Sequence, residues 1–463
     1  MSRRPRSVAE RSWEPVVATH PTDPQKVAVV YLRRGGTGAT CATNPVVRIS
    51  RDGGKSWRTT KSPPGRGASR GMGLHAAIAW GVGPRGKNRL YWANMTSAGC
   101  GSGRFSLTTS YSDDEGATWS RLRVERGTPP WVGGFPDIAV DRDPRSPNRG
   151  TVYVAYNWQG GTTHGPGFRL LASSDFGATW RRVEIGPARL ARGARDWWRI
   201  AYRVRPAPDG SVYASWYQVD LRRRDPSNIF AKGGPGNVQR LAVVTARVRF
   251  ESHLGTFRVG GSRIAARVRE TGWSTAGLSA PGTGGQIRPD PIWQYGFDVD
   301  PEGRLLVAVA DYGAARGKGP RGSITVHRSD DAGRTWSSTT LPAAPNRGRW
   351  RQSSLRPNLV TVRDVVVVTF RTLDDDRLGA TVGIAATIST DGGRSWQVPV
   401  AASRVRWRAA DLDGVTNGMG LRERAERTAD GSVFWAFGDG RLARPPTTGR
   451  TAIFSVRIDP DNR

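Results

Sequence analysis

The stretch Ser173–Trp180, SSDFGATW, is one of five copies of an eight-residue pattern, S-x-D-x-G-x-[ST]-W. The other copies begin at Ser50, Ser112, Ser329 and Ser389, so successive starts are 62, 61, 156 and 60 residues apart. In each copy the Asp can accept hydrogen bonds from its own turn, and the Gly supplies a position with positive φ. The Trp begins the next strand and offers a large surface for packing between neighbouring units. A self-closing turn at this spacing indicates a stack of hairpin-bearing modules.

The pattern resembles the Asp-box, or BNR repeat, of the sialidase-type β-propellers. In that family the motif forms the turn between the third and fourth strands of a blade, which implies an all-β propeller here. The resemblance also implies a structural role for the five motif aspartates, Asp52, Asp114, Asp175, Asp331 and Asp391. It does not imply one activity, because Asp-box propellers include sialidases, other glycosidases and binding scaffolds.

The composition and the spacing of apolar runs support this fold class. The chain has 58 Gly, 31 Pro and 18 Trp in 463 residues, and short apolar runs separated by turn residues precede each motif. The 156-residue gap predicts one blade without a motif, and a further unit follows the last copy. We therefore expect a single propeller over residues 1–463, with seven four-stranded blades at about 13–64, 71–128, 132–190, 195–262, 286–345, 352–403 and 408–463.

The two ends of the chain suggest how the ring closes. The seventh unit lacks a fourth strand before the sequence ends, and residues 6–12 have no blade of their own. A strand at 6–12 that completes the last blade would remove an exposed sheet edge. A six-bladed ring with a C-terminal extension is the alternative.

The family geometry places the motif turns on one face of the disc. The starts of the first strands and the ends of the second strands then surround the opposite mouth of the central channel, where propellers usually bind. Residues expected there are Asp137, Asp196, Arg199, Arg288, Asp290, Arg356 and Arg422 from first strands, and Arg33, Asn157, Trp158, Tyr217, Asp220, Asp311, Tyr312, Arg371, Asp374 and Asp439 from second strands. Arginines and carboxylates with a few aromatics suit an anionic or glycan-like ligand. The alternative is that many of them are solvent-facing rim residues.

From this set we select site candidates by residue type. The ligand-binding candidates are Arg199, Arg288, Arg356, Arg371, Trp158 and Tyr217, and the catalytic candidates are Asp137, Asp290, Asp311 and Tyr312. Sialidases use three arginines, a Tyr–Glu nucleophile and an Asp acid/base, and their first arginine sits in an R-I-P tripeptide that is absent here. RPD at Arg288 and RPN at Arg356 resemble it only far down the chain.

Other glycosidases would need two carboxylates roughly 5–10 Å apart across the channel. The pattern also places no Glu beside Tyr217 or Tyr312. The expected function is therefore a sialidase-like propeller that acts on or binds acidic or complex glycans. A non-catalytic scaffold for anionic polymers or proteins is the alternative.

The charge of the chain is extreme. Its formal net charge is +31, from 64 Arg and 6 Lys against 39 acidic residues. Such a field attracts acidic glycans and nucleic acid, although no nucleic-acid-binding module is visible. We expect the protein to be a monomer. Its expected partner is an acidic or complex glycan, and nucleic acid is the alternative. The five His are isolated and no phosphate-binding or dinucleotide motif occurs, so neither a metal nor a cofactor is expected.

Two features of the sequence bear on the location of the protein. No apolar stretch reaches 18 residues, so no transmembrane helix is expected. The segment MSRRPRSVAERSWEP has a basic region but no hydrophobic core, so it does not read as a signal peptide. Asp-box proteins are often extracellular, and the resemblance implies a secreted protein.

Cys41 and Cys100, the two cysteines of the chain, are predicted to form a disulfide. Each falls in an expected loop between second and third strands of adjacent blades, where their Cα atoms could lie within the ~4.4–6.8 Å that a disulfide needs. The bond would contribute ~4 kcal/mol on the chain-entropy model and indicate an oxidising compartment. Thiol titration of the denatured, unreduced protein checks this, and two reactive thiols in secreted protein would contradict it.

Overall fold

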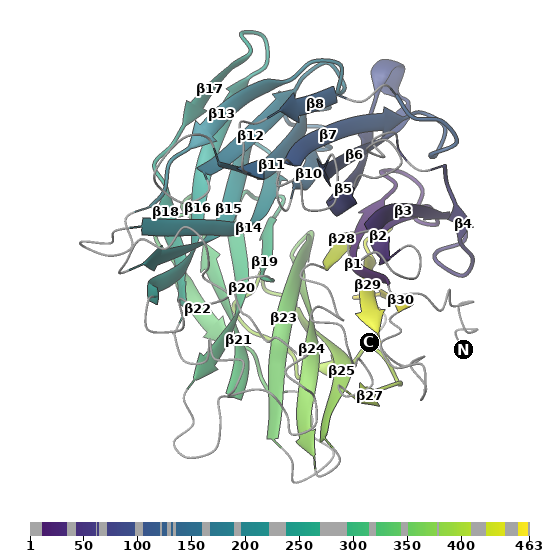
Figure 1. Cartoon of the computed structure of the whole chain (residues 1–463). Helices are drawn as coiled ribbons and strands as arrows, with labels where there is room; N and C mark the ends of the chain where they lie inside the picture. Colours follow the sequence, from purple (N-terminus) through teal and green to yellow (C-terminus); the bar gives the residue numbers. More distant parts are fainter. Residues whose placement is uncertain are drawn as a thin grey trace.

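The computed structural model describes residues 12–34, 43–61, 63, 72–97, 105–120, 123–126, 131–132, 136–159, 167–188, 196–221, 238–268, 294–313, 321–343, 351–376, 379–408, 423–439 and 452–461. Seven antiparallel sheets surround a central axis (Figure 1), and within these ranges the 3-10 turn η1 (Pro84–Gly86) is the only helical element. The expected all-β, seven-bladed propeller is confirmed.

Each blade runs outward from an innermost strand. Blade one contains β1 (Ser12–Thr19), β2 (Val27–Arg34), β3 (Thr43–Ser50) and β4 (Arg58–Thr59). Blade two contains β5 (Met72–Val82), β6 (Asn88–Ser97), β7 (Phe105–Ser112) and β8 (Arg123–Arg126). Blade three contains β10 (Asp137–Val140), β11 (Val152–Gln159), β12 (Gly167–Ser173) and β13 (Arg181–Ile185), with β9 (Trp131–Val132) paired to β11.

The remaining blades follow the same order. Blade four contains β14 (Asp196–Pro206), β15 (Ser211–Leu221), β16 (Val238–Glu251) and β17 (Thr256–Val259), with β18 (Arg263–Val268) paired to β16. Blade five contains β19 (Gly296–Val299), β20 (Leu305–Gly313), β21 (Arg321–Ser329) and β22 (Ser337–Thr340). Blade six contains β23 (Arg351–Val362), β24 (Val365–Asp376), β25 (Gly379–Ser389) and β26 (Val400–Ala401), with β27 (Trp407–Arg408) paired to β25. Blade seven contains β28 (Arg424–Arg427), β29 (Val433–Asp439) and β30 (Ala452–Ile458).

The hydrophobic core is divided among the interfaces between blades. Because side chains alternate along a strand, each blade sends one set of apolar residues to each neighbour. In β1, for example, Val16 packs toward blade two and Val17 packs toward blade seven. The seven apolar clusters of the described residues each join adjacent blades, including blade seven to blade one. The ring is therefore closed by side-chain packing.

The five sequence repeats form five nearly identical turns between third and fourth strands, which we call the repeat turns. In every copy the Ser hydroxyl donates to the Asp at 2.7–2.8 Å and accepts from the Gly N–H at the same range. The Asp also accepts the backbone N–H of the motif Ser or Thr at 2.8–2.9 Å. These bonds close each turn on its own residues, and Gly53 and Gly392 also donate to the Gln25 and Asp364 carbonyls of their blades.

The backbone of the repeat turns also explains the glycine. The motif Gly has φ between +78° and +92° in all five copies, a region that side chains with Cβ avoid. The preceding residue is left-handed as well, and there Glu115, Phe176 and Ala332 adopt it without being Gly. The motif Trp packs on the blade before its own: Trp57, for instance, lies edge-on to Phe434 with 6.1 Å between ring centroids. The repeat therefore sets both the turn and the contact between blades.

The ends of the chain meet at blade one and blade seven. Thr19 donates its hydroxyl to the Arg427 carbonyl at 2.5 Å, and Arg457 donates to the Pro24 carbonyl at 3.3 Å. Ser12 begins β1 and pairs with Arg33 in blade one. Residues 6–11, which carry most of the strand expected at 6–12, lie outside the described residues, so closure by a fourth strand stays a prediction.

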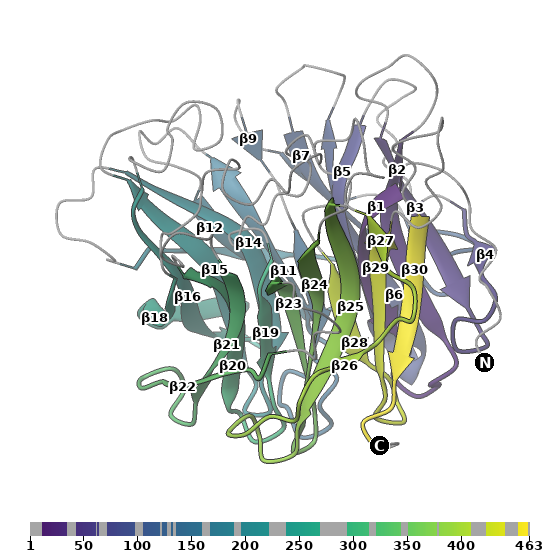
Figure 2. The same cartoon turned by 90° about the horizontal axis from the view of Figure 1, so that it is seen from below.

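Strand direction divides the two faces of the disc. Repeat turns and the turns from first to second strands lie on one face, because strands alternate in direction within each blade. The starts of the first strands and the ends of the second strands lie at the other face. Figure 2 shows the disc from the side, with the strands crossing between these faces. We call the channel ends the repeat-turn end and the far mouth.

Replacing Asp175 with Ala is expected to lower the free energy of unfolding by about 1 kcal/mol, at the lower end of the 1–3 kcal/mol for lost hydrogen bonds. The variant loses the acceptor of the Thr179 N–H and hydroxyl, and both of these donors can reach water. Urea denaturation measures the loss, with Ser174→Ala in the same turn as the control. Equal stability of the two variants would contradict a structural role for the aspartate.

Candidate functional site

Four of the innermost strands carry the same irregularity near the far mouth. Each has a β-bulge, and its first residue adopts positive φ: Glu14 (57°), His75 (54°), Ala201 (54°) and Arg356 (51°). None is glycine, so each bulge stores backbone strain. Such outliers gather at functional sites, and bulges often redirect a side chain there. We call Glu14, His75 and Arg356 the bulge residues.

Two of the bulge residues bond to each other between blades one and two. His75 Nδ1 lies 2.7 Å from Glu14 Oε2, and the two side chains are 14% and 4% exposed. A carboxylate on one ring nitrogen fixes the tautomer and orientation of a histidine, which is how proton-transfer histidines are held. Asn94 of β6 lies opposite this bulge, 1% exposed, with no hydrogen-bond partner for either amide atom. The bulges therefore assemble a histidine–carboxylate pair beside an unsatisfied buried amide.

A buried polar layer joins blades five, six and seven below the far mouth. The Gln294 amide accepts the Glu423 N–H at 3.0 Å and donates to the Glu423 carbonyl at 2.9 Å and to Asn358 Oδ1 at 2.8 Å. Glu423 also forms an ion pair with Arg371, which is fully buried and donates to the Gly438 carbonyl at 2.7 Å. Side chains thus cross the channel at this level.

Deeper in the channel, Asp137 connects several blades. Its carboxylate, 0% exposed, accepts from Val204 N–H at 2.9 Å, Arg205 at 3.1 Å and Arg424 at 3.3 Å. Arg205 also pairs with Asp298 at 3.3 Å. Burial opposes the charged form of Arg205, but Asp137 and Asp298 outweigh it and raise its pKa.

The network continues beyond these residues. Asp298 accepts the N–H of Thr361 in blade six at 2.8 Å, so a chain of polar contacts runs through blades seven, three, four, five and six. Arg142 of blade three reaches Glu426 of blade seven at 2.6 Å and the Thr19 carbonyl of blade one at 3.0 Å. These bonds therefore connect blades that are not adjacent in the ring as well as blades that are.

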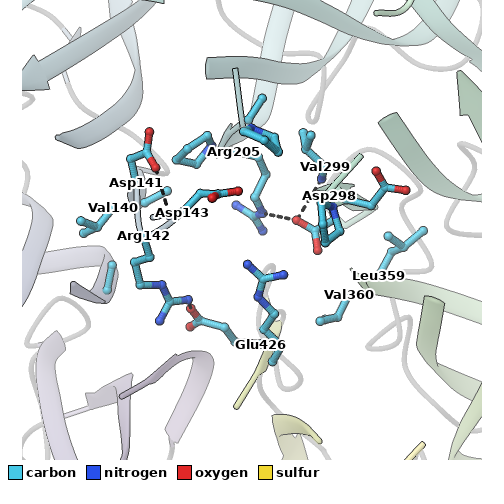
Figure 3. Close-up of a pocket in the computed structure, with 18 of the residues that line it drawn as sticks. Val140, Asp141, Arg142, Asp143, Arg205, Asp298, Val299, Leu359, Val360 and Glu426 are labelled. Atoms are coloured by element: carbon cyan, nitrogen blue, oxygen red, sulfur yellow. Dashed lines mark hydrogen bonds and ion pairs between the residues drawn. The ribbon is translucent and has the colours of Figure 1, made fainter. Parts of the chain in front are cut away.

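A small pocket lies at the repeat-turn end of the channel (Figure 3). Its volume is about 120 Å³, and its charged lining includes Arg142, Arg205, Asp298 and Glu426. The guanidiniums of Arg142 and Arg205 are engaged by carboxylates, as the dashed contacts in Figure 3 show. At about 30 Å³ per water the pocket holds roughly four waters, too few to replace with a sugar chain. Burial raises the pKa of Asp141 at its edge to about 6. Arg142 and Arg205 at this end of the channel are therefore already paired with carboxylates.

The sequence-predicted site residues have different environments. Arg199 is 3% exposed and donates to the Ile185 carbonyl, and Tyr217 is buried against Tyr295 with 4.9 Å between ring centroids. Asp311 is half-buried in β20, and Arg356 is 6% exposed. The contacts of Asp137 give it a structural role; a catalytic role for it stays a prediction.

Other predicted residues cannot be placed in the same detail. Trp158 lies in β11 and Tyr312 in β20, with side chains outside the description, as for Asp196, Asp374 and Asp439 in their strands. Arg288, Asp290 and Arg422, and both cysteines of the expected disulfide, Cys41 and Cys100, lie outside the described residues. The predicted set is therefore brought together only in part.

Sequence reasoning missed most of the polar and charged channel residues. These are Glu14, His75, Arg203, Arg205, Gln294, Asp298, Glu423 and Arg424. A signal existed for two of them: Glu14 and His75 each stand shortly before the apolar run of a first strand, as Arg356 does. Among the described residues, no group of His, Cys, Asp and Glu is arranged to hold a metal ion. No helix in the described ranges is long and apolar enough to cross a membrane.

Comparison with known proteins gives the fold alone. No protein-family model matches the sequence, and no curated protein matches it. The chain is similar to the solved structure of polysaccharide lyase Uly1, with 10% identity over 96% of this chain and 91% of that chain, and a TM-score of 0.51. It also matches an ulvan lyase of polysaccharide lyase family PL25 (12% identity, 97% and 96% covered, TM-score 0.49). A third match is the α-L-arabinofuranosidase Arb93A from Fusarium graminearum, with 11% identity over 84% of this chain and 94% of that chain, and a TM-score of 0.46.

Replacing Asp137 with Asn is expected to lower the free energy of unfolding by about 3–5 kcal/mol, because Arg205 and Arg424 would remain buried with one counter-charge removed. Guanidinium chloride denaturation at neutral pH measures it. The control is Asp143→Asn, since the more exposed Asp143–Arg145 pair is worth about 1 kcal/mol or less. A loss for Asp137→Asn no larger than for the control would show that Asp137 does not brace the ring.

Proposed function

We propose that this chain binds and cleaves an acidic polysaccharide at the far mouth of its channel. The observation that supports this most strongly is the set of bulge residues, Glu14, His75 and Arg356, each held in strained backbone at the same place in its innermost strand. The same strain recurs in four blades, with Ala201 in the fourth, and costs about 1–3 kcal/mol per residue; in the other three blades it fixes the position of an ionisable side chain.

The chemistry of these side chains suits an acidic sugar. Arg356 supplies a permanent positive charge that can pair with a carboxylate or sulfate. His75, oriented through Nδ1 by Glu14, can accept or donate a proton at Nε2. In this proposal Glu14 orients the histidine, His75 moves the proton at the reacting sugar, and Arg356 holds the acidic group.

The two channel ends favour this placement. The pocket on the channel axis at the repeat-turn end is small, and Arg142 and Arg205 in its lining are paired with carboxylates, so this pocket offers little to a polymer. The formal net charge of +31 would draw an acidic chain to the surface in either case. Polysaccharide lyase Uly1, whose fold this chain shares, carries polysaccharide cleavage in its name. A polysaccharide substrate is therefore included in the proposal, together with an extracellular location.

A sialidase-like reaction is the narrower form of the same proposal. It draws on the resemblance of the repeat turns to the Asp-box and on several arginines in the channel. The His75–Glu14 pair is not part of the sialidase pattern, so the assay must separate sialoside hydrolysis from cleavage of other acidic glycans.

A non-catalytic scaffold for anionic polymers, nucleic acid included, is the second candidate. The observation that favours it is the charge: 70 basic residues against 39 acidic ones. Binding of this kind follows counterion release and weakens steeply with salt, whatever the polymer.

His75→Ala is expected to lower turnover of an acidic polysaccharide by about 10²–10⁴-fold, the usual contribution of a positioned acid or base. Glu14→Gln should cause a smaller loss, because the histidine stays but loses its orienting charge. The assay follows reducing ends, ultraviolet absorbance of an unsaturated product and release from a fluorogenic sialoside. His253→Ala, at an exposed position in the β16–β17 turn, is the matched control.

The controls decide between the candidates. Turnover that His75→Ala leaves intact while the protein stays folded would contradict the catalytic role. If the protein binds glycan without cleaving it, and its affinities for glycan and for nucleic acid fall equally as the salt concentration rises, the scaffold function would be favoured.

A further inference from the structure

A group of buried polar atoms without partners lies between blades six and seven. Arg371 is fully buried, and although one of its terminal nitrogens binds Glu423 and the Gly438 carbonyl, its Nε and other terminal nitrogen have no hydrogen-bond partner. Asn358 Nδ2 and Thr369 Oγ1 are unpartnered as well. Buried polar groups in native proteins are almost always satisfied, so this grouping points to an occupant.

Two tryptophans belong to the same interface. Trp407 and Trp435 pack in the apolar cluster that joins blades six and seven, and the Nε1 of each is buried without a partner. The Arg371 guanidinium carbon lies 5.5 Å from the centre of the Trp407 ring. Both indole groups can only donate.

The unpartnered atoms are mostly donors. Arg371 contributes two, and Asn358, Trp407 and Trp435 contribute one each, whereas Glu423 Oε2 is an acceptor and Thr369 can do either. An occupant that satisfies them must accept several hydrogen bonds at once. An anion does this better than a neutral molecule, since charged acceptors form the stronger bonds.

The formal charge of the connected network agrees. Gln294 links this group to Arg203, which is buried and donates to the Tyr202 carbonyl at 3.0 Å. Among the described residues, Gln294 is the one side-chain acceptor of Arg203. Together with the Asp137 network and the Arg142–Glu426 pair that continues it, five guanidiniums then stand against four carboxylates. The nine groups are Arg142, Arg203, Arg205, Arg371, Arg424, Asp137, Asp298, Glu423 and Glu426. One negative charge would balance the network.

We propose that the group formed by Arg371, Asn358, Thr369, Trp407 and Trp435 binds a small monovalent anion, while Glu423 holds the Arg371 guanidinium in place. A carboxylate fits this chemistry, either as a free ion or as the acidic group of a bound sugar. The second source rests on the proposed function and would make this group the subsite that recognises a uronic acid. The first source is independent of it.

The test uses the full chain and sodium formate, exchanged for sodium sulfate at constant ionic strength. Wild-type protein is expected to show a saturable rise in melting temperature, and calorimetric titration gives the affinity. Trp407→Phe and Trp435→Phe remove one N–H donor each but keep a ring, and each should weaken formate binding about tenfold or more. Trp396→Phe is the matched control, because its buried Nε1 is also unpartnered but lies in the interface of blades five and six.

The outcomes are distinct. An absent or non-saturable response in wild type, or equal responses in all three tryptophan variants, would overturn the anion site. Arg371→Gln, if folded, should abolish the response. Titration with glucuronate and with glucose distinguishes a free ion from the acidic group of a sugar. Tighter binding of glucuronate than of glucose supports the sugar subsite. Formate binding with no preference for glucuronate rules out the sugar subsite and supports a free ion. Formate binding in a protein that binds no acidic polysaccharide would refute the proposed function and leave the anion site intact.

Discussion

The structure depends on how seven blades are held around one central axis. Asp137 provides the central constraint, since one buried carboxylate accepts from Val204, Arg205 and Arg424 and so ties blades three, four and seven together. A buried ion pair is not a strong source of stability by itself, because desolvation offsets its attraction. Here its value is geometric: wrong neighbours across the channel would leave charges unpaired.

This constraint also separates the two ends of the channel. Below Asp137, arginines and carboxylates neutralise each other around a pocket of about 120 Å³. Above it, the innermost strands carry strained bulges, and buried donors exceed acceptors between blades six and seven. The polar layer separates the two ends of the channel, so the side chains at one end do not neutralise those at the other. The unpartnered polar atoms lie on the side of the far mouth.

The sequence was a good guide to the fold and a poor one to the site, for physical reasons. The repeat turns close on their own residues, so Ser173, Asp175 and Gly177 reveal the turn without knowledge of distant contacts. Channel contacts have no such local signature. Arg424 and Asp137 are separated by 287 positions and meet only because the ring closes. His75 looked isolated because its partner, Glu14, stands 61 residues away in another blade.

We propose that ligands bind at the far mouth. Hydrogen–deuterium exchange with and without an acidic oligosaccharide tests it most directly, because it reports on both faces in one experiment. We expect added protection in β1, β5 and β23 around Glu14, His75 and Arg356, and no change in the turns that join β10 to β11 and β19 to β20. Protection of those turns with unchanged exchange at the bulge residues would contradict it.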